Sequence, residues 1–269
     1  MGISADLIYD VGSHAGEDSE FYLKKGFRVV AIEAVPELCE IAQKRLSAYV
    51  EGGRFTVLNG AIAETSQPIR FFVNNLNDDW GTTSLEWMRR NEGLGAGSCE
   101  ITVRGLEFGQ VLKEYGVPYY LKIDIEGADL LCVRALRDFA SRPRYISLES
   151  TMTSWNGLLR EFALLKELRY TKFKVVQQMN MNRQTCPFPA REGKYVDHRF
   201  DSGASGLFGE EAPGRWLTEA EALEKYQRIF RLYRLFAYYG IFTRVRLARP
   251  LVRMAGLDPG WYDTHAALY

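Results

Sequence analysis

The sequence contains few cysteines and no excess of charge of either sign. The 34 Lys and Arg residues balance the 34 Asp and Glu residues, so the formal net charge of the 269-residue chain is zero. The chain therefore has no overall field that would attract nucleic acid or an acidic partner. Its four thiols show no CxxC spacing and belong to Cys39, Cys99, Cys132 and Cys186. This pattern excludes a local zinc motif and favours isolated thiols in a reducing compartment.

A long hydrophobic run is also missing. The longest apolar run, residues 235–242, lies between Arg234 and Arg244 and is less than half the length that crosses a bilayer. No basic region followed by an apolar one precedes Asp10, so we expect no secretory signal. These absences predict a cytoplasmic protein, with peripheral contact at the inner face of the membrane as a further option.

Residues 1–150 alternate short β-rich runs with helical patterns, which predicts an α/β fold with a doubly wound, mostly parallel sheet. We expect strands over residues 7–9, 27–32, 55–58, 69–73, 99–103, 119–123, 145–148 and 172–178. We expect helices over about 19–25, 36–49, 108–115, 128–139 and 158–168.

The alternation stops after the expected core, which covers residues 1–179. Residues 180–216 are rich in Gly, Pro, Asn and charge, and a long irregular segment of this kind in a compact domain is typical of a lid. A surface loop packed on the sheet edge is the alternative. The pattern Thr-Glu-Ala-Glu at 218–221 is a capping box, which predicts a helical C-terminal extension over 217–269.

A Gly-rich turn is the clearest motif. Residues 10–17, Asp-Val-Gly-Ser-His-Ala-Gly-Glu, follow the first expected strand and open a helix. Glycine lets the backbone approach a ligand closely, and the amides at a helix N-terminus offer hydrogen-bond donors. Glu33 ends the next strand, where an acid can accept both ribose hydroxyl protons of an adenosine cofactor. The two features together predict an adenosine-containing cofactor.

Nicotinamide and flavin proteins share these features, but their G-x-G-x-x-G loop is built to admit a pyrophosphate. Here Gly12 and Gly16 are spaced G-x-x-x-G, and Asp10 precedes them. A carboxylate repels a pyrophosphate and attracts a sulfonium or an α-amino group. The charge pattern therefore favours S-adenosylmethionine and leaves a nicotinamide-dependent oxidoreductase as the alternative.

Polar groups follow three further strand ends. Asn59 and Gly60 follow the third strand, Asp124 and Glu126 follow another, and Glu149 closes the next. In an open α/β sheet, ligands bind outside the carboxyl ends of the strands. We therefore expect these groups at one site, although each acid alone also fits a solvated strand end or a helix N-cap.

The chain resembles the FkbM family of methyltransferases in four segments, at residues 10–17, 31–34, 80–85 and 121–129. The run Lys-Ile-Asp-Ile-Glu-Gly-Ala-Asp in the last segment is the most specific, and the resemblance covers roughly 7–180. It implies a class I Rossmann-like methyltransferase fold and methyl transfer to oxygen. The implied acceptors are hydroxyls of sugars, polysaccharides or secondary metabolites.

The resemblance and the strand-end positions together give a set of candidate cofactor contacts. By the resemblance they are Gly12, Ser13, Gly16, Glu33, Asn59, Ala61 and Asp124. Their position in the same turns adds Asp10, His14, Ala34 and Gly60. The resemblance supplies no universal catalytic base, and a non-catalytic module that only binds the cofactor stays a further alternative.

Methyl transfer from a sulfonium depends mainly on alignment of the acceptor with the methyl group. A base that removes the hydroxyl proton adds roughly 10²–10⁴-fold. Asp124 is the first candidate base, and Glu126, Glu149 and His198 are the others. Asp124, Glu126 and Glu149 would hold Mg²⁺ if their strand ends converge, an option that we do not favour. Lys122 shares strand parity with Asp124, and we expect a salt bridge between them.

Basic residues gather near the C-terminus. Residues 225–257 contain eight Lys or Arg and no Asp or Glu, and Arg228, Arg231 and Arg234 recur at helical spacing. We favour an amphipathic helix docked on the sheet or on a second subunit of a homo-oligomer, with the arginines facing water. Contact with an anionic membrane or a lipid-linked glycan is the alternative.

We expect a small-molecule or glycan acceptor. We expect no nucleic-acid partner, because the core carries no basic stripe.

Overall fold

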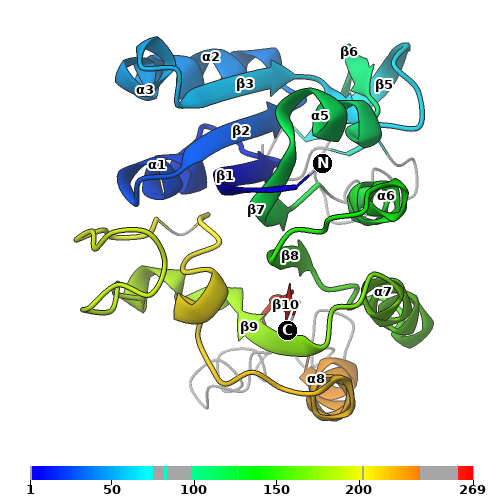
Figure 1. The fold of residues 1–269 in the computed structure, drawn as a ribbon. Helices are drawn as coiled ribbons and strands as arrows, with labels where there is room; N and C mark the ends of the chain where they lie inside the picture. The colour runs from blue at the N-terminus through cyan, green and yellow to red at the C-terminus, as the bar shows by residue number, and fades with distance from the viewer. Residues whose placement is uncertain are drawn as a thin grey trace, which may run out of the picture.

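The structure is a computed structural model that describes residues 2–74, 82–83, 98–125, 127–201, 203–236 and 260–268. Its centre is a seven-stranded sheet of order β3-β2-β1-β7-β8-β10-β9 (Figure 1). Strands β1, β2, β3, β7 and β8 pair in parallel, and β10 is antiparallel to both β8 and β9. The strands are β1 Ile3–Val11, β2 Arg28–Glu33, β3 Phe55–Asn59, β7 Val117–Ile123, β8 Tyr145–Glu149, β9 Lys172–Gln177 and β10 Tyr262–Ala267.

Helices cover both faces of this sheet (Figure 1). One face carries α1 Glu17–Lys24, α2 Pro36–Arg45 and α3 Ser47–Glu51, and the other carries α5 Phe108–Tyr115, α6 Asp129–Ala135, α7 Trp155–Glu167 and α8 Glu219–Phe236. Successive strand residues alternate between two buried clusters: Ile8 packs under α1, whereas Leu7 and Tyr9 pack under α5 and α6. This period of two on a sheet buried on both faces confirms the expected doubly wound α/β architecture.

A second sheet of order β4-β6-β5 lies beside the first, and it consists of β4 Ala61–Ile62, β5 Pro68–Asn74 and β6 Ser98–Leu106. The strands expected at 69–73 and 99–103 form its antiparallel pair. Within the loop at 80–85 the structure describes only Thr82 and Thr83, and Thr82 bridges to Phe72.

Residues from the 180–216 segment cover the same sheet face as α1, beyond the reach of that helix. Phe208 is completely buried and its ring stacks on Tyr120 of β7 with the centroids 4.7 Å apart. Glu211 forms an ion pair of 2.7 Å with Lys25, and both side chains are fully buried. A sheet with parallel strands needs cover on both faces, and this segment supplies it where no helix does. Its role as a lid stays a prediction.

The C-terminal region is not wholly helical, which corrects the expectation for 217–269. The capping box is confirmed, because the Glu221 amide donates to the Thr218 hydroxyl and the Thr218 amide donates to the Glu221 carboxylate. However, β10 inserts between β8 and β9. Its sequence contains polar residues, which are buried between the two neighbouring strands. The sequence therefore lacks the apolar pattern by which a strand is predicted.

Helix α8 packs its apolar side on the sheet. Tyr226 and Ile229 are buried, whereas Arg228, Arg231 and Arg234 are exposed. The part of the basic region that lies in α8 is therefore docked on the sheet, and contact with a membrane or a second subunit stays a prediction. In the described part of the chain, no helix has the length and apolar character needed to traverse a bilayer. Residues 237–259 lie outside the described residues.

Two predicted helices are interrupted. The expected helix over 36–49 breaks at Leu46 into α2 and α3, and the one over 128–139 ends at Ala135 and continues as a 3₁₀ turn, η2 Leu136–Asp138. The other expected core elements are present with boundaries shifted by a few residues, which is the usual uncertainty at helix and strand ends.

Candidate functional site

The Gly-rich turn joins β1 to α1 and packs against the end of β7. Gly12 has φ 80° and Gly16 has φ 85°, both in the left-handed region. A Cβ at Gly12 would lie 1.9 Å from the carbonyl oxygen of Asp124, so only glycine fits there. The Asp124 amide donates to the Val11 carbonyl at 2.9 Å. The turn and the end of β7 therefore form one rigid unit.

Glu33 ends β2 and faces this turn. Its two carboxylate oxygens accept the backbone amides of His14 and Val35, each at 2.9 Å. Burial raises the pKa of Glu33 above its ordinary value, although these hydrogen bonds act to lower it. Each carboxylate oxygen can accept more than one hydrogen bond, so the expected contact with ribose hydroxyls fits this geometry and stays a prediction.

Asn59 connects the end of β3 to the end of β2. Its side-chain amide donates to the carbonyl oxygens of Glu33 and Ala34 at 3.0 and 3.1 Å. A Cβ at Gly60 would lie 2.6 Å from the Arg104 carbonyl of β6. Ala61, in β4, and Ala34 are both buried. This rim therefore stands beside Glu33, as the strand-end positions predict, with the Asn59 amide nitrogen already engaged by the protein.

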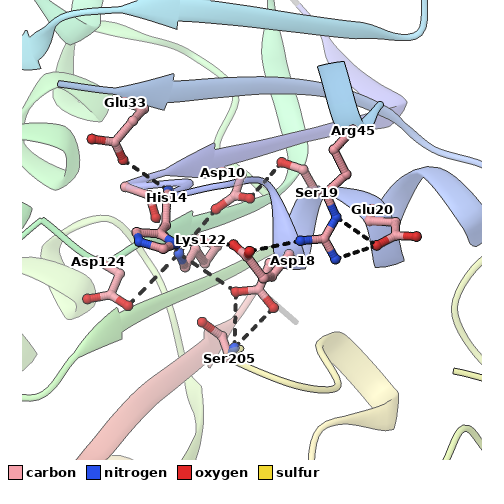
Figure 2. Close-up of polar contacts among 12 residues, drawn as sticks. Asp10, His14, Asp18, Ser19, Glu20, Glu33, Arg45, Lys122, Asp124 and Ser205 are labelled. Atoms are coloured by element: carbon pink, nitrogen blue, oxygen red, sulfur yellow. Dashed lines mark hydrogen bonds and ion pairs between the residues drawn. The ribbon is translucent and has the colours of Figure 1, made fainter. Parts of the chain in front are cut away.

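Lys122 is the central cation of the site (Figure 2). Its ammonium donates to the Gly12 carbonyl at 2.8 Å and lies 3.1 Å from Asp10 Oδ1, 3.8 Å from Asp18 Oδ2 and 3.9 Å from Asp124 Oδ2. Burial acts to lower the pKa of Lys122, but the charges of these three carboxylates outweigh burial and raise it. Lys122 stays charged, and the expected pair with Asp124 is its longest ion pair.

Asp10 is placed differently from the expectation. It is completely buried, and its second oxygen, Oδ2, accepts the Ser19 hydroxyl at 2.7 Å. Its charge is met by Lys122 from inside the protein. Asp10 would therefore make no direct contact with a cofactor bound on the turn. Its electrostatic effect on the cofactor would act through Lys122 and the turn.

The structure adds two acids that sequence reasoning missed. Both oxygens of Asp18 accept the Ser205 amide at 3.0 Å, and burial raises the pKa of Asp18 to about 6. Asp263 of β10 is 9% exposed and pairs in register with Glu149. Burial and the charge of Asp124 raise the pKa of Asp263 well above its ordinary value.

No local motif identifies these two acids. Asp18 looks like an ordinary acid in the first turn of a helix, and Asp263 belongs to a strand that the sequence pattern does not reveal. The available signal is parity: once β10 is known, alternation along the strands places Asp263 on the same sheet face as Lys122.

The expected catalytic residues are only partly brought together. Asp124 directly follows β7, with 48% of its side chain exposed, and Glu149 ends the neighbouring strand β8. His198 instead packs its ring against Phe21 and lines a pocket of about 250 Å³ with Glu17, whose helix is α1. Glu126 lies outside the described residues. In the described part of the chain no group of acids, His or Cys has the arrangement of a metal site.

A Gly-rich turn after β1, an acid at the end of β2 and an antiparallel strand inserted beside β8 define a class I methyltransferase fold, a Rossmann-like doubly wound sheet. Residues 10–172, more than half of the chain, match the methyltransferase FkbM domain. The chain therefore belongs to the FkbM methyltransferase family. No curated protein matches the chain.

Solved structures give weaker likenesses. A methyltransferase FkbM from Methylobacillus flagellatus is 18% identical, with a TM-score of 0.39 over 62% of this chain and 38% of that one. An O-methyltransferase from Bacillus cereus in complex with SAH is 16% identical, with a TM-score of 0.36 over 64% of this chain and 67% of that one. The chain thus spans well under half the length of the Methylobacillus protein.

Proposed function

We propose that this protein transfers a methyl group from S-adenosylmethionine to a hydroxyl of a sugar, a polysaccharide or a secondary metabolite. The observation that carries the proposal is the turn from Gly12 to Gly16, held against the end of β7 with Glu33 facing it, in a chain of the FkbM family. This arrangement supports a nucleoside bound across the ends of β1 and β2.

The charges around the turn fit a cationic cofactor. Asp10, Asp18 and Asp124 surround one lysine, Lys122. The three carboxylates outnumber the one ammonium, and this excess of negative charge beside the turn favours a sulfonium and an ammonium over a pyrophosphate. Ser13 is 3% exposed, and its hydroxyl has no hydrogen-bond partner in the described part of the chain. It is therefore available to a bound ligand.

Bound S-adenosylmethionine supplies a methyl group on a positively charged sulfur, which is already activated for in-line displacement. The protein contributes alignment and a proton acceptor. We assign the acceptor role to Asp124, because its carboxylate is exposed at the carboxyl end of β7 next to the turn. The Asp124 Oδ2 atom lies 3.9 Å from the Lys122 ammonium.

The proposal is tested by isothermal titration of the protein with S-adenosylhomocysteine, the demethylated cofactor, and with NAD⁺. We expect S-adenosylhomocysteine to bind and NAD⁺ not to bind. Glu33→Ala should weaken binding by about 10–100-fold, because hydrogen bonds to a charged group are lost. Glu37→Ala, an exposed acid on α2, is the matched control and should bind as wild type. Binding of NAD⁺ alone, or equal affinity in the Glu33 variant, overturns the proposal.

A further inference from the structure

Asp18 links the cofactor turn to the 180–216 segment. Its carboxylate lies between the Lys122 ammonium on one side and the Ser205 amide on the other (Figure 2). Lys122 in turn holds the Gly12 carbonyl at 2.8 Å. Four polar groups in mutual contact therefore connect the turn to a segment that is almost two hundred positions away in the sequence.

The three residues whose groups form this connection beyond the turn are buried. Asp18 and Lys122 are each 5% exposed, and Ser205 is 7% exposed. The first turn of a helix favours a carboxylate electrostatically, and an ionised acceptor makes a stronger hydrogen bond than a neutral one. The strength of the Ser205 contact therefore depends on the charge at Asp18.

Asp124 is the group through which a bound ligand would act on the charge of Asp18. Asp124 is 48% exposed and shares Lys122 with Asp18. A cation bound beside Asp124 neutralises it and leaves the Lys122 ammonium to Asp10 and Asp18. The added positive potential then favours the ionised form of Asp18, which is the form that holds the Ser205 amide most strongly.

We propose that Lys122 and Asp18 are positioning residues that couple the cofactor turn to residues 203–208, so that binding of the cationic cofactor tightens the 180–216 segment. The proposal rests on the proposed function, because the cofactor is the cation. Coupling is reciprocal: if the cofactor strengthens the Asp18–Ser205 contact, that contact strengthens cofactor binding by the same factor.

The opposite end of α1 offers a matched control. Lys25 there pairs with Glu211 at 2.7 Å, and the other Glu211 oxygen accepts the amides of Arg191 and Glu192. This second attachment holds the same segment but does not touch the turn. Its loss should loosen the segment without removing any effect of the cofactor.

The test is hydrogen exchange, followed by mass spectrometry, of the peptide containing 203–208 in the free protein, with S-adenosylhomocysteine and with sinefungin. Because S-adenosylhomocysteine keeps the ammonium and lacks the sulfonium, sinefungin, which carries an additional amine near the methyl position, is the cationic probe. At about pH 5, about one unit below the pKa of Asp18 of about 6, we expect sinefungin to slow exchange of this wild-type peptide about fivefold or more.

In Asp18→Asn the slowing should disappear, while sinefungin still binds in calorimetry with an affinity reduced by the same factor. Glu211→Gln should exchange faster in both states and keep the full effect of the ligand. Should Asp18→Asn fail to fold, Ser205→Pro removes the amide that Asp18 binds and should lose the effect in the same way.

Two results overturn the coupling: a wild-type peptide that does not respond although sinefungin binds, or an Asp18→Asn peptide that responds as strongly as wild type. The coupling is also overturned if sinefungin no longer slows exchange in Glu211→Gln, because any loosening of the segment would then abolish the effect of the ligand. If neither sinefungin nor S-adenosylhomocysteine binds wild type in calorimetry, the proposed function fails first, and the coupling fails with it.

Discussion

At the scale of single residues, Gly12 shows how a backbone contact fixes residue identity. The carbonyl of Asp124 approaches so closely that a side chain at this position would collide with it. Gly53 also has a positive φ, of 65°, but has nothing within 4 Å of an added Cβ. The two glycines therefore separate the effect of a steric contact from the effect of backbone conformation.

Gly12→Ala should lower the free energy of unfolding by about 2–4 kcal/mol, because a left-handed conformation and an overpacked contact add together. Gly53→Ala should lower it by only about 1–2 kcal/mol, from backbone conformation alone. Urea denaturation measures both values. Equal losses in the two variants would show that the contact with β7 does not determine the requirement for glycine.

Asp124 is the residue on which the proposed chemistry depends. Asp124→Asn keeps the shape of the side chain and removes the proton acceptor. We therefore expect methyl transfer from labelled S-adenosylmethionine to a panel of sugar, polysaccharide and secondary-metabolite hydroxyls to fall by about 10²–10⁴-fold. Glu114→Gln, an exposed acid on α5, should transfer at the wild-type rate. Wild-type turnover in the Asp124 variant would remove Asp124 from the proposed role.

At the scale of elements, local pattern identifies most of the core. The helix over 108–115 has the bounds expected from its sequence, because its apolar residues recur at helical spacing on one side. The strands β2, β3 and β8 lie within a residue or two of the expected ranges, because each is a short apolar run bounded by polar or turn residues.

Strand β10 shows where local pattern fails. Three of its residues, Asp263, Thr264 and His265, are polar, yet all are buried. Thr264 is satisfied by the hydroxyls of Ser150 and Tyr226, which come from other elements. The strand is therefore stabilised by partners that are distant in sequence, and no window of the sequence around it contains them.

At the scale of the whole molecule, the two faces of the sheet are completed differently. Helices α5 to α8 cover one face, whereas the other is shared between α1 to α3 and the 180–216 segment. The buried pair of Lys25 and Glu211 fixes this irregular layer to α1. The segment thus belongs to the stability of the core as well as to the proposed acceptor side.

Stability of the whole molecule should depend on pH through a buried acid of α7. Burial raises the pKa of Glu161 from 4.5 to about 8 in the folded protein. The folded state therefore binds this proton more tightly than the unfolded state. Its contribution to stability is fully present below about pH 4.5 and is lost as pH rises towards about 8.

We expect the free energy of unfolding of wild type to fall by on the order of a few kcal/mol between about pH 5 and about pH 8. Glu161→Gln should reduce this slope, since Gln carries no ionisable proton. Urea denaturation across this range measures both. Burial also raises the pKa of Asp263 well above its ordinary value and the pKa values of Asp18 and Asp129 to about 6. These acids contribute in the same direction, so part of the slope should remain. An unchanged slope in the variant would contradict the assignment.

Local sequence was sufficient to predict the doubly wound core, the glycines of the turn and the position of Glu33. These depend on short-range patterns, namely alternation along strands, helical spacing and the conformation that only glycine adopts. The partners of the buried charges could be identified only in the folded chain. Asp10 is matched by Lys122 of β7, and Asp18 binds Ser205. Pairing of buried charges depends on which strands and segments become neighbours in space, and sequence spacing does not specify those neighbours.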